Sequence, residues 1–175
     1  MLFRSSGGAT KRFSLINSPI FTANIGIKGD GISGYFSTDY SPSINGVNYT
    51  LNNAMVAVYV FDNIAIDSSA LDCGNDDYGA NVVIIPRDST NFLGAQINNS
   101  DFERLGFALS TSIGLTSVFR TNSSIMSCAK NGINVSSGTG ITAIDSLPTY
   151  EITALSNGVY TGNISFLCAG SGSID

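Results

Sequence analysis

Residues 149–168, TYEITALSNGVYTGNISFLC, alternate between apolar and polar side chains on both sides of an Asn-Gly pair. A period of two is typical of a strand with one buried face, and Asn-Gly accommodates the positive φ angles of a tight turn. We therefore predict a β-hairpin here. Two further pairs, Asn45-Gly46 and Asn131-Gly132, also separate extended candidate runs, and three such turns favour antiparallel pairing.

The chain from residue 20 onward has the pattern of an all-β domain. Short apolar or alternating runs are separated by clusters of Gly, Asn, Asp and Ser. We predict a mainly β fold, an antiparallel β-sandwich or a jelly-roll-like domain. The candidate strands are 20–28, 32–37, 47–51, 54–61, 81–86, 116–121, 124–129, 141–145, 149–155 and 158–168.

One segment breaks the β pattern. Ser100 and Glu103 have the S-x-x-E spacing of a capping box, and Phe102, Leu105 and Leu109 repeat at helical spacing. The spacing predicts one short helix, at about 101–112, that covers a face or an end of the sheets.

The 175 residues are one domain's length of chain. Residues 1–13, MLFRSSGGATKRF, contain Arg4, Lys11 and Arg12 but no acid, and their Ser-Ser-Gly-Gly run does not hold regular structure by itself. We predict a flexible basic N-terminal arm over residues 1–13 and a single β-rich domain over residues 14–175.

The composition is short of charge. Charged side chains make up 12% of the chain, whereas an ordinary soluble domain carries about 25%. Interface cores are depleted of Lys, Glu and Asp and enriched in aromatic residues, and this chain has ten Phe and seven Tyr. We interpret the deficit as an exterior that neighbouring copies cover. The alternative is a solvated surface of hydroxyl and amide groups.

Several classes of chemistry and partner are excluded by composition. Histidine is absent, which excludes every mechanism that needs an imidazole. The net charge of −5 argues against a nucleic-acid partner. The longest uninterrupted apolar run, residues 54–61, falls far short of the ~20 residues of a membrane-spanning helix, so we expect no membrane partner. Cys73, Cys128 and Cys168 lack metal-ligand spacing and are expected to be buried thiols in a reducing compartment.

Two motif matches lack the context that their chemistry requires. Residues 29–34, GDGISG, match G-x-G-x-x-G, but no helical pattern follows to meet a pyrophosphate. We interpret them as a Gly-rich connection between strands. Ser127 and Lys130 have the S-x-x-K spacing of serine acyl-transfer enzymes, but they lie in a strand that runs into a turn, so they do not share a helical face. We predict no catalytic and no cofactor-binding residue.

An acidic loop at residues 67–77, DSSALDCGNDD, brings Asp67, Asp72, Asp76 and Asp77 together in sequence. Calcium prefers oxygen ligands, but the loop lacks the spacing and the bidentate glutamate of a calcium-binding loop. We interpret it as a solvated loop, with a calcium site as the alternative, and we predict no metal ligand.

These observations favour a non-catalytic structural protein of a homomeric assembly. In composition and architecture the chain resembles a virion component of a tailed phage, such as a head-decoration, tail or fibre accessory protein. Its expected partners are copies of itself, in a trimer, and other virion proteins, with no cofactor.

The alternative is an extracellular or surface-displayed β-sandwich that binds carbohydrate or acts as an adhesin or pilin-like subunit. Tyr35, Tyr40 and Tyr49 are then candidates for stacking on sugars. Glycans would then occupy the five N-x-[ST] sequons, at Asn48, Asn98, Asn122, Asn134 and Asn163.

Overall fold

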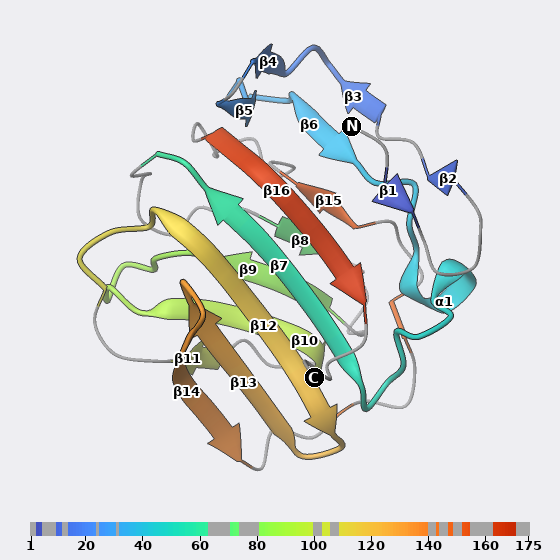
Figure 1. The fold of residues 1–175 in the computed structure, drawn as a ribbon, viewed down its shortest axis with the longest axis vertical. Coiled ribbons are helices and arrows are strands. Elements are labelled where there is room, and N and C mark those ends of the chain that lie inside the picture. The colour runs from blue at the N-terminus through green and yellow to red at the C-terminus, as the bar shows by residue number, and fades with distance from the viewer. Residues whose placement is uncertain are drawn as a thin grey trace.

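The protein is a sandwich of two antiparallel sheets, as predicted (Figure 1). Each sheet has seven strands, and a separate two-stranded ribbon, β1 (Phe3–Arg4) with β2 (Thr10–Lys11), precedes them. This computed structural model describes residues 3–4, 10–11, 14–23, 25–30, 32–62, 71–73, 81–99, 103–105, 109–139, 143, 147–148, 152–154 and 163–170.

The front sheet of Figure 1 is built around β7 (Ala54–Val60), which lies between β12 and β16. Its strands, in spatial order, are β14 (Ile133–Thr139), β13 (Ile125–Lys130), β12 (Gly114–Asn122), β7, β16 (Asn163–Gly170), β5 (Gly26–Lys28) and β4 (Ile20–Thr22).

The back sheet lies behind it in the same view. Its strands, in spatial order, are β11 (Glu103–Leu105), β10 (Leu93–Asn99), β9 (Asn81–Ile85), β8 (Leu71–Cys73), β15 (Thr153–Ala154), β6 (Tyr35–Ser37) and β3 (Ser14–Ile16).

The core lies between the sheets and follows from the alternation of side chains along the strands. In β7 every second residue is fully buried and belongs to the core cluster, whereas Met55 and Tyr59 between them are only partly buried. Complete burial of one such aliphatic side chain contributes about 1.5–3 kcal/mol. The front sheet supplies Val56, Val58, Val60, Val118, Met126 and Cys128 to this cluster, and the back sheet supplies Val82, Ile84, Leu93, Ala95 and Ile97.

The two sides of the sandwich differ. On one side the last strands of the sheets, β11 and β14, contact each other. On the other side the last described strands, β3 and β4, are consecutive in the chain and are joined by only residues 17–19. We call this second side the open side.

The predicted helix at about 101–112 is wrong. Glu103–Leu105 instead forms β11, which pairs with β10 in the register Leu93↔Leu105 and Ala95↔Glu103. A capping box is a local preference of about 1 kcal/mol, and pairing with a fully buried strand overrides it. The helix that forms is α1 (Pro42–Asn45), one turn long.

The hairpin predicted from residues 149–168 does not form as a pair. Thr153 and Ala154, in β15, pair with β6 and β8 of the back sheet, whereas β16 pairs with β5 and β7 of the front sheet. The two strands have the predicted extended structure, but they lie in different layers. Asn157-Gly158 lies outside the described residues.

The other two Asn-Gly pairs have different outcomes. Asn131-Gly132 forms the predicted turn between β13 and β14, with φ of 52° and 79°. Asn45-Gly46 ends α1 instead, where the Gly46 N–H donates to the Pro42 carbonyl (3.1 Å). Of the described residues, no helix has the length and apolarity needed to cross a membrane.

Candidate functional site

The open side carries large apolar side chains in contact with solvent. In β4 all three residues are exposed, with Ile20 at 60% and Phe21 at 66%. Leu15 of β3 is 48% exposed, and Ile32 in the loop between β5 and β6 is 81% exposed. We call Leu15, Ile20, Phe21 and Ile32 the open-side patch.

The chain reaches this arrangement through two tight loops that bond to each other. Asn17 and Ser18, between β3 and β4, have positive φ of 55° and 58°, and Pro19 then begins the approach to β4. The Asn17 Nδ2 donates to the Ser33 carbonyl (3.1 Å), which ties this turn to the loop that carries Ile32. The turn after β3 and the loop that carries Ile32 therefore lie side by side at the open side.

A single carboxylate organises the second loop. Asp30 Oδ1 accepts from the N–H groups of Ile32 (2.9 Å), Ser33 (2.9 Å) and Gly34 (2.6 Å). These bonds, the one from Ile32 foremost, lower the pKa of Asp30 below its usual 3.8. The G-x-G-x-x-G match is therefore a carboxylate-capped connection between β5 and β6, as predicted, and its amides are already occupied.

The S-x-x-K match does not bring its two side chains together. Regular pairing of β13 with β12 keeps the alternation intact, so Lys130 lies on the same face as the core residues Met126 and Cys128, and Ser127 lies on the other. The spacing therefore has no catalytic meaning in this fold.

Lys130 is instead a buried cation at the end of the sandwich. It is 8% exposed, and its Nζ donates to the Ser112 carbonyl (2.7 Å) and to Thr116 Oγ1 (3.0 Å). No carboxylate among the described side chains pairs with it, and burial lowers the pKa of Lys130 to about 8. Arg87 acts on the same segment, since its Nη1 donates to the Ser110 carbonyl (3.0 Å). The two cations therefore bind backbone carbonyl groups of residues 110–112, the segment that leads into β12.

A second polar cluster lies inside the sandwich at the end of β10. Asn98 has φ of 55° at an irregularity in the pairing with β9, and it is completely buried. Its Oδ1 accepts from the Tyr49 hydroxyl (3.0 Å), and its Nδ2 donates to the carbonyls of Thr50 (3.2 Å) and Leu51 (3.0 Å). Arg120, fully buried beside this cluster, donates from Nε to the Ile97 carbonyl (3.0 Å). The Arg120–Ile97 bond joins the two sheets, and the side chains of Tyr49, Asn98 and Arg120 are all buried.

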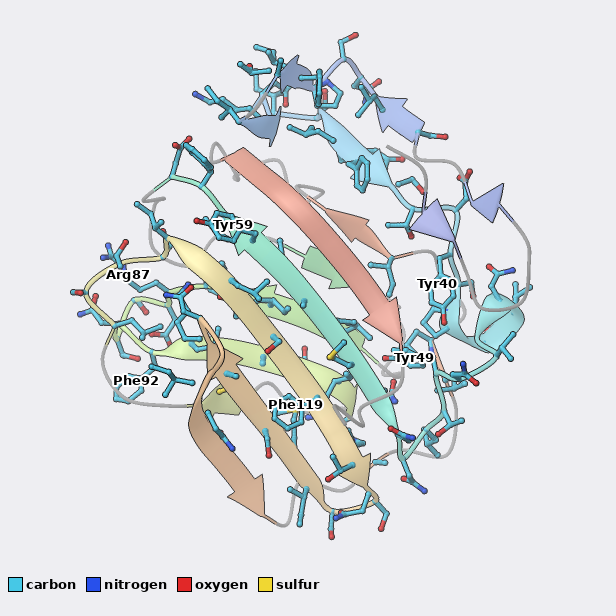
Figure 2. All side chains as sticks on the ribbon, in the orientation of Figure 1. Tyr40, Tyr49, Tyr59, Arg87, Phe92 and Phe119 are labelled. Atoms are coloured by element: carbon cyan, nitrogen blue, oxygen red, sulfur yellow. The ribbon has the colours of Figure 1, made fainter. Side chains whose placement is uncertain are left out.

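The three tyrosines named as candidates for stacking on sugars in the alternative function do not form an exposed row. Tyr49 is 1% exposed, and Tyr40 packs against it edge-on with ring centroids 6.5 Å apart (Figure 2). Burial raises the pKa of Tyr40 to about 12. Tyr35 is half-buried in β6. Two of the three rings therefore serve packing, and the three do not form one exposed platform.

The remaining candidate residues are only partly described. Of the acidic loop, Leu71–Cys73 forms β8, and the rest of residues 67–77, with Asp67, Asp76 and Asp77, lies outside the described residues. Among the described side chains, no group of three potential metal ligands gathers. Of the sequons, Asn98 is buried and its side chain is fully engaged, whereas Asn48, Asn122 and Asn134 are exposed and the Asn163 side chain is not described.

Sequence reasoning missed the open-side patch. The sequence predicted a strand over 20–28 and said nothing of the exposure of Ile20 and Phe21 or of residues 15–19. The signal that could have revealed an edge is Pro19, because proline in a sheet is confined to edges, first positions and bulges.

No family model matches this chain, and no curated protein matches it. Among solved structures, the chain is similar to a family 7 alginate lyase, A1-II′, a variant crystallised in complex with its substrate. The identity is 12% and the TM-score 0.37, and the match covers 99% of this chain and 82% of the other.

This match corrects one prediction from the sequence. We predicted that the chain is not an enzyme, and the match to a lyase contradicts that prediction, so we do not retain it. A likeness this distant assigns no activity, substrate or residue to the present chain.

Proposed function

We propose that this chain is a structural subunit of a homomeric assembly and that the open-side patch is its contact surface. The observation that carries the proposal is β4, an edge strand whose three side chains are all exposed and include Ile20 and Phe21. An exposed apolar edge strand is a template for pairing with another chain. Complete burial of one Ile or Phe contributes about 1.5–3 kcal/mol. A complex in which a partner covers this edge is therefore stabilised by the burial of these side chains.

The composition supports the same function. Only 12% of the residues are charged, which matches surfaces that become buried in interfaces. The aromatic rings are not all inside the molecule either, since Phe21 is 66% and Phe61 43% exposed. A solitary domain wetted by amides and hydroxyls alone would not present these rings.

We propose the virion of a tailed phage as the setting of this assembly. The support is compositional: a small β-rich chain without histidine, short of charge, with basic residues at its start. Quantitative mass spectrometry of purified particles tests this setting, because a virion subunit is present at a fixed number of copies per particle and a contaminant is not.

The test of the contact surface is the mass of the protein in solution. Light scattering at micromolar concentration is expected to show a stable oligomer, and Phe21→Asp is expected to lower its mass to that of one chain. Ile133→Asp is the matched control, because Ile133 is 67% exposed but lies in β14 at the far side of the front sheet. A monodisperse monomer of the unmodified protein would overturn the proposal. Equal masses for the two variants would show that the contact lies elsewhere.

A further inference from the structure

We infer that the partner on the open side is a second copy of this chain, which adds its own β4 antiparallel to β4 about a two-fold axis. The inference rests on the proposed function and specifies its geometry. It concerns which strand meets which, and therefore which atoms face each other across the contact.

Strand β4 has the properties of a pairing edge. It is bonded to β5 on one side only, in the register Ile20↔Lys28, Phe21↔Ile27 and Thr22↔Gly26, and no other described strand lies beyond it. Its side chains are exposed on both faces of the sheet, so an added strand is flanked by apolar groups above and below. Backbone hydrogen bonds supply the affinity in such strand addition, and the alternate side chains supply the specificity.

The rest of the molecule favours a second copy meeting β4 with its own β4. Head-to-tail contacts would instead pair β4 of one copy with β3, β11 or β14 of the next. Of the three β3 side chains only Leu15 is exposed, whereas β4 exposes all three, and β11 and β14 already lie against each other. A contact that uses the same patch on both copies is closed by a two-fold axis.

The charges beside the patch are compatible with self-contact. The exposed charged residues next to β4 are Lys28, across from Ile20 in β5, and Asp30, two residues further along the chain. They have opposite signs, so the described charges beside β4 sum to zero, and two copies of this surface meet without net repulsion. A strongly acidic or strongly basic partner would find no matching net charge beside β4.

Two-fold antiparallel pairing centred on β4 makes a definite prediction of register. Phe21, the middle residue, faces Phe21 of the second copy, with Cα atoms about 4.5–5.5 Å apart. Ile20 then faces Thr22 of the second copy. Two cysteines at directly opposed positions satisfy the geometry of a disulfide, which needs Cα atoms about 4.4–6.8 Å apart.

Cysteine cross-linking tests the register. Under mild oxidation, Phe21→Cys is expected to double in mass on a non-reducing gel, and reduction is expected to reverse the change. Ile20→Cys alone is expected to stay single, but an equal mixture of Ile20→Cys and Thr22→Cys is expected to cross-link. Ile133→Cys, equally exposed on β14, and the unmodified protein, with its native cysteines, are the controls.

The outcomes separate this inference from the proposed function. If the unmodified protein is oligomeric but Phe21→Cys cross-links no more than Ile133→Cys, the β4 pairing is wrong and the assembly function stands. If Ile20→Cys cross-links alone, the register is wrong. If the unmodified protein is a monomer at all concentrations, the proposed function fails and the pairing fails with it. If light scattering shows a trimer, the two-fold pairing is wrong but the assembly function stands, because copies joined by a single two-fold contact form a dimer.

Discussion

The buried side chain of Lys130 makes a quantitative prediction of how stability depends on pH. Its Nζ is bonded only to the Ser112 carbonyl and to Thr116 Oγ1, and no described carboxylate neutralises it. Burial lowers its pKa from 10.5 to about 8. The unfolded chain keeps the proton up to pH 10.5, whereas the folded chain releases it near pH 8, so the unfolded state binds more protons between these values. Stability is therefore expected to increase with pH across that window.

The size of the increase follows from the two pKa values. A fall from 10.5 to about 8 corresponds to about 3 kcal/mol of unfolding free energy. Lys130 is 8% exposed, so solvent screening removes little of it. Tyr40 acts in the opposite direction above pH 10: its pKa is raised to about 12, so the unfolded chain ionises first and stability falls. The test therefore uses the range pH 8 to 10, and the difference between the unmodified protein and Lys130→Met cancels the contributions of the cysteines and tyrosines.

The assay is urea unfolding followed by far-ultraviolet circular dichroism, because the chain has no tryptophan for fluorescence. The unmodified protein is expected to gain stability from pH 8 to 10, and Lys130→Met is expected to lack this gain. Lys28→Met, at an exposed lysine of β5, is the control and is expected to keep it. Superimposable pH profiles for the unmodified protein and Lys130→Met would refute the reasoning.

Three further predictions concern single contacts. Gly114→Ala is expected to cost about 1–3 kcal/mol, because Gly114 has φ of 117° and a Cβ there would clash with the Asn131 side chain. Gly132→Ala, with open space around it, is expected to cost less, and thermal unfolding of the two variants compares them. The amide resonances of the Asp30 loop are expected to titrate with a midpoint below pH 3.8 and to lose this titration in Asp30→Asn, measured by nuclear magnetic resonance; a midpoint at or above 3.8 contradicts the three-amide cap. Tyr49→Phe removes a buried hydrogen bond and is expected to cost about 1 kcal/mol in urea unfolding; no loss would show that the Tyr49 hydroxyl contributes nothing to stability.

The fold class could be predicted from the sequence because the alternation of apolar and polar side chains can be seen within each strand, without knowledge of its partner strands. The pattern of residues 54–61 corresponds to β7, and the Asn131-Gly132 turn was predicted correctly because its positive φ angles need those residue types. Strand β10 was missed, since LGAQINN places Gln96, Asn98 and Asn99 in a run that is buried throughout. Asn98 is hydrogen-bonded to Tyr49, Thr50 and Leu51, and the Asn99 Oδ1 accepts from the Ile97 N–H. Hydropathy alone does not show these bonds.

Layer assignment and exposure could not be predicted. The strands β15 and β16 have the alternation of a hairpin, but the choice of sheet depends on partners distant in the sequence, Phe36 for Ala154 and Val60 for Ile164. The exposure of Ile20 and Phe21 could not be predicted for the same reason, because an apolar residue in an edge strand looks the same in the sequence as one in a central strand. Non-local pairing decides both.

The contact between β11 and β14 has a consequence for how far association can proceed. In the pairing that we propose, β4 of each copy meets β4 of one other copy, and growth then ends at two chains. If a substitution separated β11 from β14, each dimer would gain further exposed edges, and edge pairing would then be expected to continue from dimer to dimer into filaments. Under that proposal, the contact between β11 and β14 limits the size of the assembly, although it lies far from the open-side patch.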